Sequence, residues 1–315
     1  MPIPVSEALE DQQTSAITKA RAARTSMARY LATSAMAGAY VGVAVVLLVM
    51  VSAAFVAAKS PSAKLVQGAV FGVALTLVVF AGAELFTGNV MVMLQGLMRR
   101  RVRALDVGVV WVASLLGNLA GSLLFAGLVN ASGVLSAGAA RGQPTVFMAT
   151  LAGIVKSKAG LSGGQLFMRS ILCNMLVCLA LWMAGRTRSD AAKLICLWWA
   201  LLAFIASGFE HSIANMTVFG LGIFGHVPLA GWSEMTRNLV FTVPGNVLGG
   251  GLLVGLAYGW AGRAEPVAVA AGATDTVAGV TALAREVEGA AAPRVDGAVV
   301  ETRESVSALV TGQPG

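Results

Sequence analysis

Long uninterrupted runs of apolar residues occupy the middle of the chain. A helix needs about 20 apolar residues to cross the hydrocarbon core of a bilayer. Six runs are long enough, and they predict an all-α membrane protein with six transmembrane helices. The runs cover residues 30–58, 65–98, 106–132, 166–184, 191–224 and 239–260.

The second and fifth runs are too long for one straight crossing. Each also holds an ionisable residue close to glycine: Glu84 in the second run, and Glu210 and His211 in the fifth. Charged groups and glycine interrupt a regular membrane helix, and irregular backbone at that depth must be buried in protein or line a cavity. We therefore expect broken helices in spans 2 and 5.

A short motif recurs in the two halves of the chain. The third run contains GNLAG at 117–121, and the sixth contains GNVLG at 245–249. The breaks in the second and fifth runs correspond in the same way, so spans 1–3 and 4–6 are interpreted as two copies of one unit. Because three is an odd number, the second copy enters the membrane from the opposite side, which predicts an inverted 3+3 repeat.

An inverted repeat with paired broken helices places the transport site near the middle of the membrane. The half-helices there present unpaired N–H groups and the positive ends of their dipoles. Both features favour a bound anion over a cation. The pattern therefore indicates an anion pore.

Composition agrees with a membrane protein. The chain is 57% hydrophobic and 12% charged, with a mean hydropathy of +0.79. A soluble domain with this composition could not cover its surface with polar groups. The Lys and Arg residues that give the net charge of +7 lie in short loops between apolar runs. They do not form a stripe with interleaved aromatic residues. We therefore expect the lipid bilayer as surroundings and no nucleic acid as partner.

Lysine and arginine predict the orientation, because cytoplasmic loops carry the excess of both. The denser group comprises Lys19, Arg21, Arg24, Arg29, Arg99, Arg100, Arg101, Arg103, Arg186, Arg188, Lys193 and Arg263. The sparser group comprises Lys59, Lys64, Arg141, Lys156, Lys158 and Arg237. This distribution predicts a multi-pass protein of the inner membrane with both termini in the cytoplasm.

Three parts of the chain follow from these patterns. Residues 1–29 are expected to form a cytoplasmic interfacial helix, 30–263 the six-span channel domain, and 264–315 a cytoplasmic, disordered tail. The N-terminus lacks the basic and apolar segments of a cleavable signal peptide. The cysteines Cys173, Cys178 and Cys196 lie in apolar runs without metal-ligand spacing, so no metal or cofactor is expected.

Three segments resemble the formate/nitrite transporter family. They are AGAELFTGN at 81–89, ILCNMLVCLALWMA at 171–184 and AFIASGFEHSIANMTVFGLGIF at 203–224. The segments at 34–48 and 205–217 are more similar to the nitrite channel branch than to the formate branch. The resemblance implies an aquaporin-like fold, a homopentamer and a separate pore in each protomer.

Three residues are the leading candidates for the pore. His211 is the only histidine in a predicted span, and an intramembrane ionisable residue indicates function; the resemblance implies that it is the central pore histidine. Thr87 could cap the second half of its broken helix, and the resemblance makes it the partner of His211. Lys158 is expected in a loop before the fourth span, where the resemblance implies a lysine that attracts the anion. Lys156 is a weaker candidate.

Other polar and apolar residues have supporting roles. Asn174 and Asn246 could either bond helices together or line the pore. Glu84 and Glu210 are expected to support the structure by accepting backbone N–H bonds from their own breaks. The resemblance assigns two apolar constrictions, above and below the histidine, to Phe71, Leu75, Leu85, Phe86, Val177 and Phe204.

The expected function is transport of nitrite, linked to protons through the central histidine. A channel for formate or another small monocarboxylate is the nearest alternative, and a membrane scaffold without transport is the alternative of another class. No HExxH or GxSxG motif occurs, so we expect no enzyme and no catalytic residue. An aquaporin-type pore for neutral solutes would need paired Asn-Pro-Ala motifs, which the sequence lacks.

Overall fold

The computed structural model describes residues 2–139 and 143–262. All regular elements in these residues are helices, which confirms the all-α prediction for this part of the chain. The tail predicted at 264–315 lies outside the described residues.

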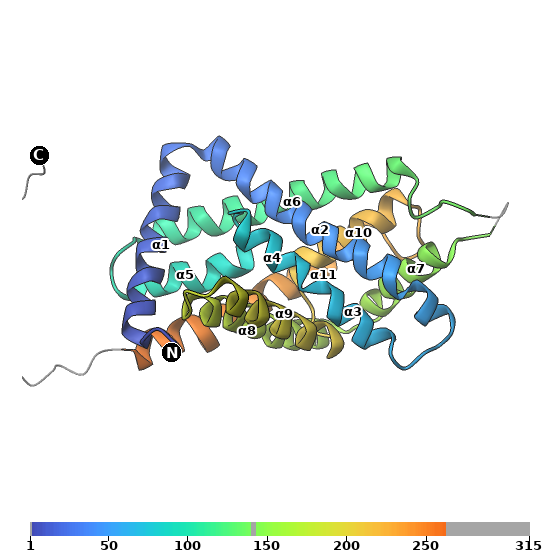
Figure 1. Ribbon diagram of the computed structural model, residues 1–315. Coiled ribbons are helices and arrows are strands. Elements are labelled where there is room, and N and C mark those ends of the chain that lie inside the picture. The colour runs from blue at the N-terminus through green and yellow to red at the C-terminus, as the bar shows by residue number, and fades with distance from the viewer. Residues whose placement is uncertain (1, 140–142, 263–315) are drawn as a thin grey trace, which may run out of the picture. The chain divides into compact units, whose positions relative to one another are not determined.

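Residues 2–139 form six helices (Figure 1). They are α1 (Val5–Thr25), α2 (Met27–Ala57), α3 (Ala63–Phe71), α4 (Val73–Phe80), α5 (Phe86–Met98) and α6 (Ala104–Ser132). The helix expected near the N-terminus is α1, which lies across one end of the bundle. Ser26 separates it from α2, and the Ser26 hydroxyl accepts from the backbone N–H of Arg29.

The second half, described from residue 143 onward, is also helical. It contains α7 (Val146–Ala159), α8 (Gly163–Gly185), α9 (Asp190–Ala206), α10 (Ser212–Phe224), α11 (Trp232–Val247), the π-helix η1 (Leu248–Leu256) and α12 (Ala257–Ala261).

Helix α7 corrects one sequence-based expectation. Lys158 lies in the last turn of this helix and not in a loop. Thr145 caps the helix by accepting from the backbone N–H of Met148 at 3.1 Å. With 14 residues, α7 is too short to be recognised as a membrane span.

Within residues 2–139 and 143–262, five helical segments are long and apolar enough to cross a membrane. They are Met27–Ala57, Ala63–Phe80, Ala104–Ser132, Gly163–Gly185 and Trp232–Ala261. The predicted span at 191–224 is not one of them, because it is divided between α9, of 17 residues, and α10, of 13.

Two short non-helical segments lie between apolar helices at corresponding places in the halves. One joins α4 to α5 at residues 81–85, and the other joins α9 to α10 at residues 207–211. Gly82 and Gly208 turn the chain there with φ angles of 73° and 74°, a region that favours glycine. Figure 1 shows α5 running from the middle of the bundle toward the α1 end and α10 toward the α7 end.

Close packing of helices holds these segments in place. Helix α2 packs along α6, and α8 packs against α11 and η1. The second glycine of each repeated motif lies at such a contact. A Cβ atom on Gly121 would overlap the carbonyl of Ala35, and one on Gly249 would overlap the carbonyl of Ile171. Glycine therefore permits the same close approach in both halves.

Candidate functional site

His211 and Thr87 meet where the two breaks face each other. The Nε2 atom of His211 lies 3.2 Å from the Oγ1 atom of Thr87. His211 is the N-cap residue of α10, while Thr87 lies in the first turn of α5. Both are buried, with exposed fractions of 4% and 0%. The two half-helices therefore present their positive ends to the same buried place.

The hydrogen bonds of His211 define its protonation. Its Nδ1 atom accepts from the backbone N–H of Ala214 at 3.1 Å, which requires an unprotonated Nδ1. The ring proton therefore lies on Nε2, which donates to Thr87 Oγ1. His211 is a neutral imidazole that caps α10 with one nitrogen and offers a donor with the other.

Two asparagines bind the backbone on either side of the breaks. Asn118 Oδ1 accepts from the N–H of Phe86 at 2.9 Å, and Asn118 Nδ2 donates to the carbonyl of Glu84 at 2.9 Å. In the other half, Asn246 Oδ1 accepts from the N–H of Ser212 at 2.9 Å, and its Nδ2 donates to the carbonyl of Glu210 at 3.1 Å.

These contacts favour a structural role for Asn246. They also identify Asn118, which the sequence analysis did not select, although the repeated GNxxG motif marks both positions. Asn174 connects helices as well, because its Nδ2 donates to the carbonyls of Thr87 at 3.2 Å and of Asn246 at 2.6 Å. Asn174 and Asn246 are both 0% exposed, and helix bonding accounts for their contacts.

The partners of Glu84, which is partly buried, and of Glu210, which is buried, differ from the expectation. Glu84 accepts from Lys19 Nζ at 2.7 and 2.9 Å and from Asn89 Nδ2 at 3.0 Å. Glu210 accepts from Lys158 Nζ at 2.9 and 3.1 Å and from Asn215 Nδ2 at 2.8 Å.

The prediction that these carboxylates accept backbone N–H groups is therefore wrong. Asn118 and Asn246 already take those groups, so each carboxylate is free to pair with a lysine from another helix. A buried carboxylate needs such a partner, because the unpaired charge would be costly.

Two pockets flank the His211–Thr87 contact. The Lys158 pocket has a volume of about 120 Å³ and includes the break residues Gly208 and Glu210. Its polar lining consists of Lys64, Gln67, Ser157, Lys158, Arg169 and Glu210. Lys156 is not among its lining residues.

The Lys19 pocket has a volume of about 420 Å³ and includes the other break. Its polar lining consists of Gln12, Ser15, Lys19, Glu84, Asn89 and Lys193. Glu210 immediately precedes His211, and Gly88 of the Lys19 pocket immediately follows Thr87. His211 and Thr87 thus lie between residues that line the two pockets.

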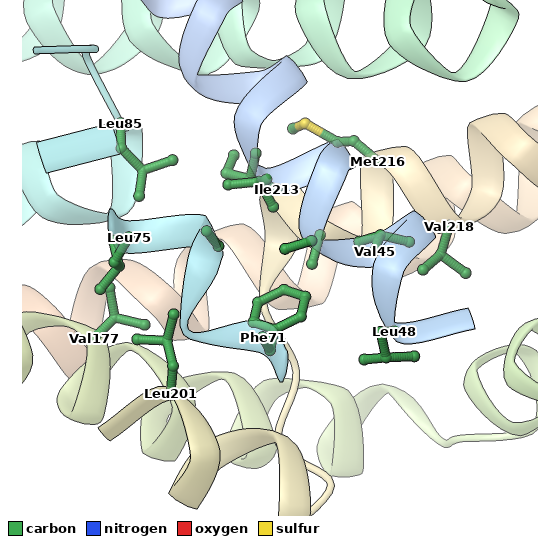
Figure 2. Packing of buried hydrophobic residues seen from close by; sticks show 14 of the residues in the cluster. Val45, Leu48, Phe71, Leu75, Leu85, Val177, Leu201, Ile213, Met216 and Val218 are labelled. Carbon is green, nitrogen blue, oxygen red and sulfur yellow. The ribbon is translucent and has the colours of Figure 1, made fainter. Parts of the chain in front are cut away.

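The six apolar residues assigned to constrictions are all buried. They are Phe71, Leu75, Leu85, Phe86, Val177 and Phe204. Phe204 stacks on His211 with ring centroids 5.9 Å apart, and it meets Phe71 edge-on at 5.6 Å. Figure 2 shows Phe71, Leu75, Leu85 and Val177 approaching the same interior from different elements. Phe71 lines the Lys158 pocket and Leu85 the Lys19 pocket.

Within residues 2–139 and 143–262, no group of three or more His, Cys, Asp or Glu side chains could hold a metal ion. The titratable side chains beside the two breaks include the Lys19–Glu84 and Lys158–Glu210 pairs and His211.

The sequence relatives are transporters by name. A profile described as "Formate/nitrite transporter" matches residues 6–260. The chain is 42% identical over 252 residues to "Nitrite transporter NirC" of Escherichia coli (strain K12), a match that covers 78% of this chain and 89% of the relative. It is 37% identical over 244 residues to the "Probable formate transporter" of Methanothermobacter thermautotrophicus, covering 74% and 88%.

Solved structures share the fold. An "FNT family ion channel" superposes with a TM-score of 0.74 at 36% identity, covering 81% of this chain and 98% of the other. A "Pentameric formate channel with formate bound" superposes with a TM-score of 0.62 at 25% identity, covering 76% and 98%. These matches confirm the resemblance that the sequence motifs indicated: the chain is a membrane protein of the formate/nitrite transporter family.

Proposed function

We propose that this protein transports nitrite across the inner membrane through a pore in each protomer of a homopentamer. The 42% identity to proteins named nitrite transporter supports the substrate. The similarity to a pentameric formate channel supports the assembly. The observation that carries the proposal is the His211–Thr87 contact, which lies between two pockets that each contain a lysine.

The proposed architecture is the six-span inverted repeat. Residues 81–85 and 207–211 interrupt spans 2 and 5, and matched asparagines bind both interruptions, which supports two copies of one unit. The distribution of Lys and Arg supports cytoplasmic termini. In this orientation the Lys19 pocket opens to the cytoplasm and the Lys158 pocket to the outside.

The free energy of desolvation favours passage as the neutral acid. Moving a bare anion into an apolar constriction costs on the order of tens of kcal/mol. Protonating nitrite at neutral pH costs only about 4 to 5 kcal/mol, at 1.36 kcal/mol for each unit between pH and pKa. The anion therefore takes up a proton before it passes the phenylalanines and leucines around His211.

The neutral state of His211 determines its part in this passage. A second ring proton would occupy Nδ1 and remove the acceptor that caps α10 at Ala214. A standing positive charge at the centre is thus disfavoured, and Nε2–H serves as a hydrogen-bond donor to the passing substrate. Thr87 holds that donor in place when the site is empty.

Formate is the second candidate substrate. The chain is also similar to a protein named as a probable formate transporter and to a channel with formate bound. Both ions are small, monovalent and carry two oxygens, so one pore can accept either. Their relative rates decide the physiological substrate.

Flux into proteoliposomes tests the proposal. The full chain is reconstituted, and nitrite entry is followed beside protein-free liposomes, because nitrous acid also crosses lipid unaided. We expect protein-dependent nitrite entry that formate reduces by competition. Flux equal to that of protein-free liposomes for nitrite would contradict the proposed substrate, and formate entry in the same preparation would then establish the alternative.

A further inference from the structure

The Lys158 pocket carries more positive charge than its carboxylate neutralises. Lys64 of α3, Lys158 of α7 and Arg169 of α8 line it together with a single acidic residue, Glu210. Lys158 pairs with Glu210 at 2.9 Å. Among the described residues, neither Lys64 nor Arg169 forms an ion pair. Two cations thus face this pocket without a carboxylate of their own.

In the Lys19 pocket, each positive charge of the lining has a carboxylate partner. Lys19 pairs there with Glu84 at 2.7 Å, in the same way as Lys158 pairs with Glu210. The remaining cation in its lining, Lys193, pairs with Asp190 at 3.1 Å. Excess positive charge is therefore a property of one pocket and not of the repeated architecture.

The internal repeat shows what Arg169 adds. The backbone N–H of Glu210 donates to the carbonyl of Arg169 at 3.3 Å, and the N–H of Glu84 donates to the carbonyl of Thr33 at 3.3 Å. Arg169 therefore occupies the position that Thr33 fills in the other half. A threonine supports the break equally well at this backbone position, so the guanidinium is not required to build it.

The guanidinium contributes little to the protein's own hydrogen bonding. Its one hydrogen bond within the described part of the chain is a long contact of 3.4 Å from Nη1 to the carbonyl of Gly208. A guanidinium has five N–H donors in a planar fork that matches two oxygens on one atom. Nitrite and formate both present this pair of oxygens.

We infer that Lys64 and Arg169 form, together with Lys158, an anion-capture site in the Lys158 pocket. Arg169 binds the two oxygens of the ion side by side, and Lys64 raises the concentration of anions at the entrance. The inference rests on the proposed function and adds two residues that concentrate the substrate on one side of the pore.

Substitutions at the two positions test this inference in proteoliposomes. Arg169→Thr introduces the residue of the other half, Arg169→Lys keeps the charge without the fork, and Lys64→Gln removes the exposed charge. Lys156→Gln is the matched control, because Lys156 lies on α7 two residues before Lys158 but does not line the pocket. A single elution position in detergent verifies that each variant is assembled.

The measured quantity is the slope of the nitrite entry rate against nitrite concentration, taken at low concentration with equal pH on both sides. A passive pore has the same low-concentration permeability in both directions, so mixed insertion does not obscure the comparison. We expect Arg169→Thr and Lys64→Gln to lower this slope about three- to tenfold at low ionic strength. Arg169→Lys should fall between wild type and Arg169→Thr, and the saturated rate should change less than the slope.

Salt separates capture from a structural defect. In roughly 1 M of an impermeant salt the screening length is about 3 Å, so the difference between wild type and variants should largely vanish. The inference is overturned if Arg169→Thr and Lys64→Gln keep the wild-type slope, if Lys156→Gln lowers it equally, or if the loss persists at high salt. If wild type carries formate but not nitrite, the proposed substrate fails and the same comparison with formate decides the capture site.

Discussion

Asn118 and Asn246 make the same hydrogen bonds in the two halves of the chain. Each accepts from the first N–H of a short helix and donates to the carbonyl two residues before it. Each also donates to a carbonyl of a neighbouring helix, Ser34 at 2.7 Å and Ser170 at 2.8 Å. One side chain thus satisfies backbone groups on both sides of each break.

Replacing Asn246 by alanine should lower stability strongly. The change leaves the buried N–H of Ser212 and the carbonyl of Glu210 without their partner, and each unsatisfied group costs about 1 to 3 kcal/mol. Thermal unfolding in detergent should show a clear fall in Tm, with a similar fall for Asn118→Ala. Replacement of exposed Asn130 on α6 provides the control, and an unchanged Tm for Asn246→Ala would refute the assigned role.

Replacing His211 by asparagine should impair transport more than folding. Asparagine is a good N-cap residue and can still accept from Ala214, but its shorter side chain does not place a donor at Thr87. Loss of a buried hydrogen bond to the substrate should reduce nitrite flux about 10- to 100-fold. Flux and Tm are measured on the same preparation. Wild-type flux in this variant, with an unchanged dependence on pH, would exclude the histidine from the transport step.

The Lys158–Glu210 pair should show strong coupling in a double-mutant cycle. The Glu210 side chain is 5% exposed, so Lys158→Met leaves a buried carboxylate without its lysine partner. Breaking one partner of a buried pair typically costs about 3 to 5 kcal/mol, whereas replacing both costs much less. The free energy of unfolding of Lys158→Met should therefore recover when Glu210→Gln is added. Additive losses from the two single changes would contradict the pairing.

Two glycines should differ sharply in their tolerance of alanine. At Gly249 an added Cβ overlaps the carbonyl of Ile171, whereas at Gly108 of α6 nothing lies within 4 Å of it. Gly249→Ala should lower Tm or prevent assembly, because the helix backbones must separate. Gly108→Ala should be neutral or slightly stabilising, since alanine favours a helix by about 1 kcal/mol over glycine. Equal effects at both positions would argue against close helix packing at the repeated motif.

Much of the site could be predicted from the sequence, because its residues are ionisable or polar side chains within long apolar runs. Glu84, Glu210 and His211 are conspicuous inside long apolar runs, and the interruptions of the helices lie beside them. The paired GNxxG motif also marked Asn118, but only the hydrogen bonds show why an asparagine is needed there.

Other features depend on contacts between distant segments, which residue patterns do not specify. Lys19 is 65 residues from Glu84 and comes from a helix outside the apolar runs, so nothing in the local sequence indicated their pairing. Arg169 lies near the start of an apolar run, where an arginine ordinarily marks the end of a span. Its place in the Lys158 pocket follows from the packing of α8 beside the break.

Proton movement during nitrite entry distinguishes passage of the neutral acid from passage of the bare anion. Proteoliposomes containing a pH-sensitive dye receive an inward nitrite gradient, with and without an imposed membrane potential. If the substrate passes a neutral His211 as the neutral acid, the lumen acidifies in step with nitrite entry and the potential has no effect on the rate. Entry that is accelerated by an inside-positive potential, without acidification beyond that of protein-free liposomes, would contradict this account and show that the bare anion crosses.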